Sequence, residues 1–145
     1  MIAAAFSSGP LLFSAHQGRN NSQTFWYFLL QLAHLLQKTG EGWKERYLLV
    51  LDNVSFHRSR YLMEKLQKFQ LPVHFLGPYS FQAAPVEQVF AFMKQEDLGP
   101  TLLNRRLAKE ELLQEVALQI QKKEYPPMQS LFRHCLKALE EQTQE

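Results

Sequence analysis

Residues 46–52, RYLLVLD, constrain the fold of this chain more than any other part of its sequence. Five apolar residues follow Arg46 without a polar interruption, and the run ends at Asp52. An unbroken apolar run of this length is typical of a strand buried on both faces, as in a sheet that helices cover. We therefore predict an α/β fold with a strand from Arg46 to Asp52 that is buried on both faces.

The segments on either side of this strand add helices and short strands. Apolar runs at residues 1–6 and 11–16 flank the turn residues SSGP and predict a hairpin. Apolar spacing and capping residues predict helices at residues 21–38, 59–69 and 85–96, and a strand at residues 73–76. The first of these helices is apolar enough to be packed on most sides. Beyond residue 100 the pattern is helical only, with amphipathic helices at residues 107–120 and 131–139.

The composition is that of a soluble globular protein, with 145 residues, 46% hydrophobic and 21% charged. The net charge of +2 is too small to indicate a partner. Cys135 is the only cysteine, which excludes an intramolecular disulfide, and its apolar neighbours predict a small core residue. The five histidines lack the paired spacing of a zinc site. The apolar residues 25–36 are too few to span a bilayer, so we predict an intracellular protein without a membrane partner.

Two carboxylates stand where chemistry can occur. Asp52 ends the predicted buried strand, and open α/β sheets place their sites at the carboxyl ends of strands. Glu87 lies in the first turn of a predicted helix, where the helix dipole favours an anion. If the two carboxylates converge, they repel each other unless a cation lies between them. Mg²⁺ (or Mn²⁺) suits such an oxygen site, and the chemistry would then be phosphoryl transfer on a nucleic acid.

The residues themselves leave simpler alternatives open. Asp52 could cap a turn together with Asn53, and Glu87 could merely complement the helix dipole. The cations that follow Asp52 could attract phosphate or could form a solvated helix face. These cations are Arg58, Arg60, Lys65 and Lys68.

Two motifs resemble the mariner-type and related bacterial insertion-sequence transposases of the DDE superfamily. Residues 47–59, YLLVLDNVSFHRS, are similar to the family's apolar strand followed by Asp-Asn, three residues and His. Residues 77–94, GPYSFQAAPVEQVFAFMK, are similar to its Pro-Tyr-Ser…Glu…Lys segment. The thirty-four residues between Asp52 and Glu87 match the family's spacing. Upstream, residues 4–32 resemble its hairpin and first helix, so the likeness covers about residues 1–97.

The resemblance implies a ribonuclease-H-like catalytic domain at residues 1–98, without its first strand, and a C-terminal helical extension at residues 99–145. It implies Asp52 and Glu87 as the second and third acids of the catalytic triad and as ligands of Mg²⁺ or Mn²⁺. Asn53 and His57 match motif positions that shape the turn, and His57 is open to a helix-cap or a catalytic role. The implied backbone-positioning residues are Tyr79 and Ser80. The implied DNA-contacting residues are Arg58, Arg60, Lys65 and Lys94.

The sequence departs from the family in two places. Residues 1–40 contain no aspartate or glutamate, although the family's first catalytic aspartate is expected upstream of the hairpin. We therefore expect the first strand, its acid and the DNA-binding helix-turn-helix region to be absent. In the loop before Glu87, Phe81 replaces the usual proline and Ala83-Ala84 replace Leu-Asn, which removes hydrogen-bonding groups.

Two functions follow from this pattern. The first is a transposase fragment whose ancestral activity is magnesium-dependent DNA strand cleavage and transfer during transposition. The second is a catalytically inactive, domesticated or decayed module that binds nucleic acid or protein. The partners implied by the resemblance are DNA, a second copy of the chain, or an upstream segment that supplies the missing strand. The implied location is the nucleus in a eukaryote and the cytoplasm or nucleoid in a bacterium.

Overall fold

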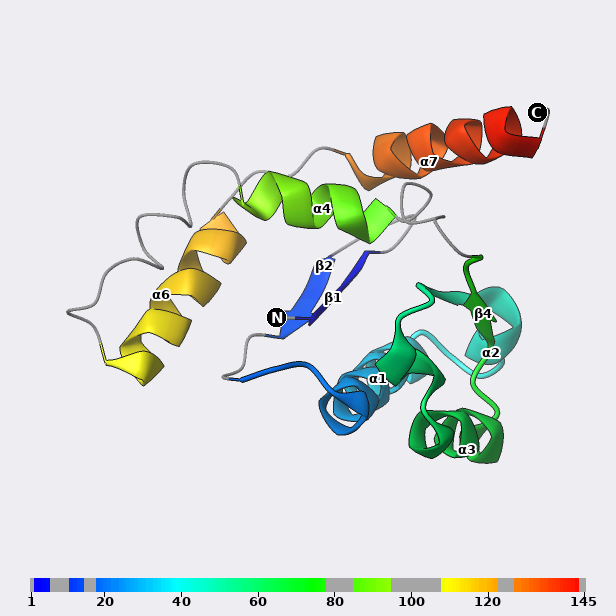
Figure 1. Cartoon of the computed structure of the whole chain (residues 1–145), viewed down its shortest axis with the longest axis horizontal. Coiled ribbons are helices and arrows are strands. Elements are labelled where there is room, and N and C mark those ends of the chain that lie inside the picture. The colour runs from blue at the N-terminus through cyan, green and yellow to red at the C-terminus, as the bar shows by residue number, and fades with distance from the viewer. Residues whose placement is uncertain are drawn as a thin grey trace. The chain divides into compact units, whose positions relative to one another are not determined.

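The computed structural model of the chain describes residues 2–5, 11–14, 18–77, 85–94, 108–122 and 127–143 (Figure 1). The chain divides into two compact units. The first comprises Met1–Ile2 and Gly18–Ala84, and the second comprises Ala3–Gln17 and Pro85–Glu145. The predicted domain boundary between residues 98 and 99 falls at residues 95–107, outside the described part of the chain, and stays a prediction.

The first unit is built around a β-α-β arrangement. Its elements are α1 (Ser22–Gln37), α2 (Trp43–Arg46), β3 (Leu49–Leu51), the 3-10 helix η1 (Ser55–Arg58), α3 (Arg60–Phe69) and β4 (Val73–Phe75). Strands β3 and β4 pair in parallel, with Leu49 opposite Val73 and Leu51 opposite Phe75. Because parallel neighbours need a crossover connection, η1 and α3 lie between the two strands in the chain.

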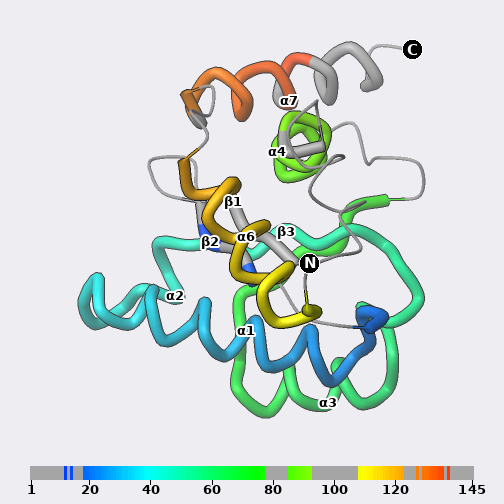
Figure 2. Tube along the Cα trace, turned by 90° about the vertical axis from the view of Figure 1, so that its left-hand side faces the viewer, coloured from blue at the N-terminus to red at the C-terminus, as the bar shows by residue number. Residues whose placement is uncertain are grey.

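Helix α1 begins and ends where the sequence predicts. The side chain of Asn21 accepts hydrogen bonds from the backbone N–H groups of Gln23 and Thr24, each at 2.9 Å. Thr24 Oγ1 in turn accepts the N–H of Asn21 at 3.0 Å, which completes a capping box. Helices α1 and α3 pack against each other within the first unit (Figure 2). Six apolar residues of α1 are buried: Phe25, Trp26, Phe28, Leu29, Leu32 and Leu36.

The prediction that α1 is packed on most sides is wrong. Tyr27 and Leu35 are 57% and 40% exposed, so α1 buries one broad face and leaves the other to solvent. The reason is that the contacts of α1 in the first unit come from α3 and η1, whereas the apolar run in the sequence extends around the helix.

The predicted strand at residues 46–52 is also shorter and more exposed than its sequence suggests. Trp43 is buried and begins the short helix α2, of which Arg46 is the last residue. The guanidinium of Arg46 donates to the backbone carbonyl of Glu41 at 3.0 Å, so this residue belongs to the α2 turn and not to the strand. Strand β3 consequently starts at Leu49.

The prediction of burial on both faces of this strand is wrong as well. Leu49 is buried, but Val50 is 49% exposed, and Leu48 just before the strand is 62% exposed. Since side chains alternate between the two faces of a strand, one face of β3 meets the core and the opposite face is left open.

Helix α3 matches its prediction at both ends. Ser59 caps it by accepting the backbone N–H of Leu62 at 3.3 Å, and Leu62 and Leu66 are buried. The helix ends at Gln70, which adopts a left-handed conformation with φ 49°. The N–H groups of Gln70 and Leu71 then reach back to the carbonyls of Gln67 and Leu66, the pattern of a Schellman motif.

The second unit contains a strand pair and three helices in its described part. Strand β1 (Ile2–Ala5) pairs with β2 (Leu11–Ser14), as predicted, and the predicted turn at residues 7–10 lies outside the described residues. The helices are α4 (Pro85–Lys94), α6 (Lys109–Lys122) and α7 (Met128–Thr143). Helix α4 packs on α7, where Val89 and Cys135 are almost fully buried. The prediction that Cys135 is a core residue is therefore confirmed.

Candidate active site

Asp52 directly follows β3, at the carboxyl end of the parallel pair of strands. A third of its side chain is exposed, at 33%. Parallel sheets of α/β proteins bind ligands at this edge. The position of Asp52 at the end of a strand is the arrangement that the sequence predicts.

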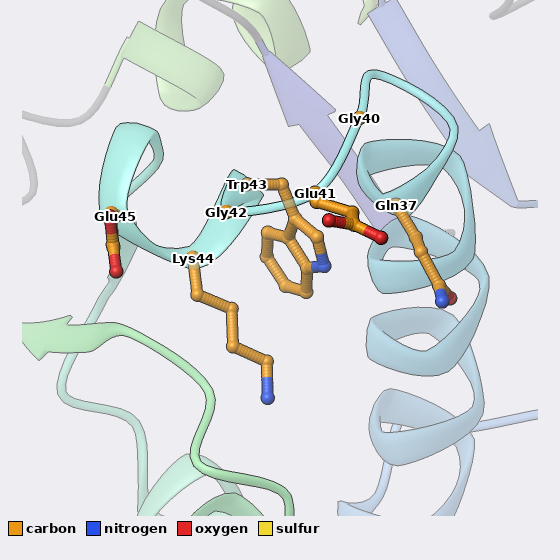
Figure 3. Close-up of a pocket in the computed structure, with 7 residues that line it drawn as sticks. All are labelled: Gln37, Gly40, Glu41, Gly42, Trp43, Lys44 and Glu45. Atoms are coloured by element: carbon orange, nitrogen blue, oxygen red, sulfur yellow. The ribbon is translucent and has the colours of Figure 1, made fainter.

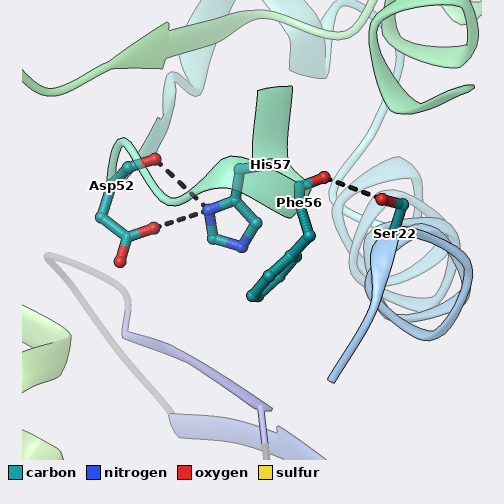
Figure 4. Close-up of polar contacts among 4 residues, drawn as sticks. All are labelled: Ser22, Asp52, Phe56 and His57. Carbon is teal, nitrogen blue, oxygen red and sulfur yellow. Dashed lines mark hydrogen bonds and ion pairs between the residues drawn. The ribbon is translucent and has the colours of Figure 1, made fainter. Parts of the chain in front are cut away.

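His57, on η1, turns its ring back onto Asp52 (Figure 4). Its Nδ1 atom lies 2.6 Å from Oδ1 of Asp52 and 3.3 Å from the backbone carbonyl oxygen of the same residue. Both neighbours are acceptors, so Nδ1 must carry the proton and the neutral ring has its hydrogen on that nitrogen.

The single N–H of His57 cannot satisfy both oxygens equally. It is aligned with the backbone carbonyl, whereas Oδ1 is nearer but lacks an aligned hydrogen bond. Oδ1 of Asp52 is therefore a buried carboxylate oxygen without a hydrogen-bond partner in the described structure. Such an atom is costly to bury unless a positive charge or a donor lies beside it.

Two phenylalanines hold the His57 ring. Phe25 of α1 stacks on it, with ring centroids 3.9 Å apart and an angle of 27° between the planes. Phe56 meets the ring edge-on, at 4.4 Å and 81°. Ser22 donates to the backbone carbonyl of Phe56 at 3.0 Å and so ties η1 to the first turn of α1 (Figure 4). Together these contacts fix the plane of the imidazole relative to the end of β3.

Burial sets the protonation state of His57. It lowers the pKa of His57 below the ordinary value of 6.5, although the nearby Asp52 carboxylate acts in the opposite direction. The ring is therefore neutral at neutral pH, and the contact with Asp52 is between a neutral donor and a carboxylate. The helix-cap interpretation of His57 is wrong, because Ser59 caps α3 and His57 lies inside η1.

Glu87 lies in the first turn of α4, as predicted, and its side chain is exposed. Its neighbours Gln88 and Val89 pack within the second unit instead, since Gln88 donates to Sγ of Cys135 at 3.6 Å and Val89 is buried. Glu87 belongs to the second unit and Asp52 to the first.

The remaining predicted site residues differ in what the structure says of them. Asn53 is exposed immediately after Asp52. Tyr79 and Ser80 lie outside the described residues, and Lys94 is the last residue of α4, with no description of its side chain. Within the described part of the chain, no three histidine, cysteine, aspartate or glutamate side chains gather as a metal site.

The predicted DNA-contacting cations of the first unit lie on η1 and on α3. Arg58 is exposed and stacks over the Phe75 ring at 4.9 Å. Arg60 is paired with Glu64 at 2.8 Å, both side chains being largely exposed, so part of its charge is offset locally. Lys65 lies over the ring of Tyr61 at 5.6 Å. These contacts orient the cations and leave Arg58 and Arg60 open to solvent.

An open hollow elsewhere in the first unit is formed by the turn between α1 and α2 (Figure 3). It is lined by Gln37, Gly40, Glu41, Gly42, Trp43, Lys44 and Glu45. Lys44 donates to the backbone carbonyl of Phe69 at 2.6 Å, at the end of α3. The cation at this hollow therefore has a structural partner, and Asp52 is not among its lining residues.

Sequence reasoning did not identify the roles of Phe25, Phe56 and Ser22 at the site. Phe25 reads as one more apolar residue of an amphipathic helix, because its contact with His57 joins two distant segments of the chain. Phe56, in contrast, is the immediate neighbour of a motif histidine, so a contact between its ring and the histidine could be expected from the sequence.

The fold and the site thus define an α/β domain with a carboxylate and a clamped histidine at the end of a parallel strand. A family model described as DDE superfamily endonuclease matches residues 1–109, and the chain belongs to this family. A crystal structure of the catalytic domain of Mos1 mariner transposase is similar, with a TM-score of 0.57 and 20% identity. The match covers 92% of this chain and 65% of the other. It shows that the fold is ribonuclease-H-like.

No curated protein sequence matches the chain. In the described residues, no helix is both long and apolar enough to cross a membrane.

Proposed function

We propose that this chain is the catalytic part of a transposase that cuts and joins DNA strands with the help of Mg²⁺ or Mn²⁺. In this proposal Asp52 and Glu87 hold the cation. The observation that supports it most is the buried Oδ1 of Asp52, which has no aligned hydrogen-bond donor and lies at the carboxyl end of a parallel strand. The family's domain at residues 1–98 would carry the reaction, and residues 99–145 would extend it with helices.

Asp52 fits a divalent metal ligand on its own chemistry. Its oxygen atoms are the ligand type that Mg²⁺ prefers, and a third of the side chain is open to a ligand from solvent. A cation bound at the open side of the carboxylate would supply the positive charge that the buried Oδ1 lacks. When bound, such a metal stabilises the charge that develops on a reacting phosphate group.

The other predicted residues would place the DNA. Arg58, with its guanidinium oriented over Phe75, and the exposed Arg60 would contact backbone phosphates together with Lys65 and Lys94. Asn53 would shape the turn behind Asp52, and Tyr79 and Ser80 would set the backbone before Glu87. Contacts of this kind depend on salt concentration but not on DNA sequence.

The reaction is expected to be slow in this chain by itself. The family's triad has three carboxylates, and residues 1–40 contain none that could be the first. Metal stabilisation of the reacting phosphate is worth several kcal/mol, so loss of one ligand should slow cleavage by roughly a thousandfold. A segment that supplies the first acid, or a second copy of the chain, would be the natural partner.

Metal binding provides the direct test. The chain and its variants are titrated with Mn²⁺, and free Mn²⁺ is followed by electron paramagnetic resonance. Asp52→Asn and Glu87→Gln should each weaken binding by more than about tenfold, because each removes a charged oxygen ligand. Glu64→Gln is the matched control, since Glu64 is exposed and paired with Arg60 on α3. Equal affinity in all four proteins would contradict the proposal.

DNA cleavage separates this function from the non-catalytic one. Purified chain is incubated with supercoiled plasmid and Mn²⁺ in the presence or absence of an upstream segment that bears an aspartate. Slow nicking that is accelerated by the segment and abolished by Asp52→Asn supports the transposase. Tight DNA binding that does not depend on metal, with no nicking under any condition, would instead support a nucleic-acid-binding module.

A further inference from the structure

We propose that His57 is a positioning residue for Asp52: its Nδ1–H donates to the backbone carbonyl of Asp52 and lies beside Oδ1, so that the carboxylate keeps one orientation for a cation. The metal part of this inference rests on the proposed function. The contact between His57 and Asp52 itself stands on the geometry of the first unit.

The contact restrains Asp52 at two points. Nδ1–H is aligned with the backbone carbonyl oxygen at 3.3 Å, and Oδ1 of the same residue lies 2.6 Å from Nδ1 without an aligned hydrogen bond. The positive end of this N–H beside Oδ1 favours one orientation of the carboxylate by electrostatic attraction. In Figure 4 the second carboxylate oxygen is directed away from the ring, which leaves it open to another ligand.

The ring can act as a positioning group because it is itself held. Phe25 of α1 covers its face and Phe56 of η1 meets its edge. His57 as a whole is 8% exposed, so water does not compete strongly for Nδ1. A histidine that orients a carboxylate next to a metal reduces the rotational freedom that the ligand would lose on binding.

A purely structural role for His57 makes the opposite prediction from a positioning role. If the ring only fills space between Phe25 and Phe56, Mn²⁺ affinity should be kept in His57→Phe and reduced in His57→Asn. If Nδ1–H positions Asp52, Mn²⁺ affinity should be better kept in His57→Asn than in His57→Phe. The side-chain N–H₂ group of asparagine can reach nearly the same place as Nδ1–H. Phenylalanine keeps the stacking but has no donor.

The first measurement uses the metal-free full chain. Nitrogen-15 NMR of the His57 ring should show that the proton is on Nδ1, because both atoms that Nδ1 faces are acceptors. A proton on Nε2 at neutral pH would overturn the proposal, since Nδ1 could not then donate to Asp52. This result does not depend on whether the chain binds a metal.

The second measurement compares His57→Phe with His57→Asn. Mn²⁺ affinity should fall by about tenfold to a hundredfold in His57→Phe and by less than about threefold in His57→Asn. Thermal unfolding without metal should show the reverse order, with His57→Asn the less stable protein. Unchanged affinity in His57→Phe, or equal losses in both variants, would overturn the proposal. Failure of the wild-type chain to bind Mn²⁺ would overturn the proposed function, and the tautomer would still decide whether His57 donates to Asp52.

Discussion

Ser22 and Phe56 are thirty-four residues apart in the sequence, and the hydroxyl of Ser22 donates to the backbone carbonyl of Phe56 at 3.0 Å. This bond joins the first turn of α1 to η1, the element that carries His57. Because the bond is partly buried, the carbonyl has little alternative access to water. The site at Asp52 is therefore fastened to α1 by a polar contact as well as by the stack of Phe25 on His57.

Replacement of Ser22 by alanine should destabilise the first unit by about 1 kcal/mol, because the Phe56 carbonyl loses its donor. Urea unfolding followed by tryptophan fluorescence measures this directly, since both tryptophans of the chain, Trp26 and Trp43, are buried in the first unit. Gln23→Ala, at the next and exposed position, should leave the midpoint unchanged. A loss of similar size in both variants would point to helix propensity and not to the hydrogen bond.

The capping box of α1 predicts a second loss. Asn21→Ala should cost about 1 kcal/mol, since the N–H groups of Gln23 and Thr24 lose the acceptor that Asn21 provides. Asn21→Ser is the control, because serine caps about as well as asparagine. The same fluorescence measurement applies, and an Asn21→Ser protein as unstable as Asn21→Ala would contradict the capping argument.

Leu62 offers a test of the packing between α1 and α3. Its side chain is fully buried, so Leu62→Ala should lower the free energy of unfolding by about 2–5 kcal/mol through lost burial and a cavity. Met63 is its neighbour on the same helix and is 44% exposed, so Met63→Ala should change stability by less than about 0.5 kcal/mol. Comparable losses would mean that α3 does not pack through the Leu62 face.

The end of α3 should accept a stabilising substitution. Gln70 has a left-handed backbone with φ 49°, which glycine adopts without strain. Gln70→Gly should therefore raise the free energy of unfolding by about 0.5–1 kcal/mol. Gln67→Gly, three residues earlier and inside the helix, should lower it by up to about 1 kcal/mol. Opposite changes in the free energy of unfolding from these two glycine substitutions would support the left-handed backbone at Gln70 as the cause.

His57 predicts how stability depends on pH. Its pKa is lowered on folding, so the unfolded chain takes up a proton at a higher pH than the folded one. This contribution to stability is complete above pH 6.5 and is lost as the pH falls through the ordinary pKa towards the folded one. Urea midpoints between about pH 7.5 and pH 5 should decline in the wild type and decline less in His57→Phe. Identical slopes in the two proteins would place the pH dependence elsewhere.

Much of the fold follows from local sequence signals. The caps at Asn21 and Ser59 correctly place the starts of α1 and α3, and Pro85 correctly starts α4. The position of Asp52 at the end of a strand is also predicted, because an apolar run that stops at an aspartate is a local pattern. Each of these signals acts over a few residues and does not depend on the rest of the fold.

The features that the sequence did not predict depend on interactions between distant segments of the chain. The short helix α2 forms because Trp43 is buried and Lys44 donates to the end of α3, and neither contact is visible in the pattern of RYLLVLD. The stack of Phe25 on His57 likewise joins two distant segments and cannot be seen in a local pattern. The convergence of Asp52 and Glu87 stays a prediction, since it depends on how two separate units come together in the working protein.

The parallel pairing of β3 with β4 has a consequence for the order in which the first unit folds. Adjacent antiparallel strands can meet through a tight turn, whereas Leu49 reaches Val73 only after η1 and α3 have folded back across the sheet. The loop entropy of that return is lost before any strand hydrogen bond forms. Amide protons of α3 should thus become protected from hydrogen exchange earlier in refolding than those of β3, and Asp52 should reach its final position among the last residues to do so.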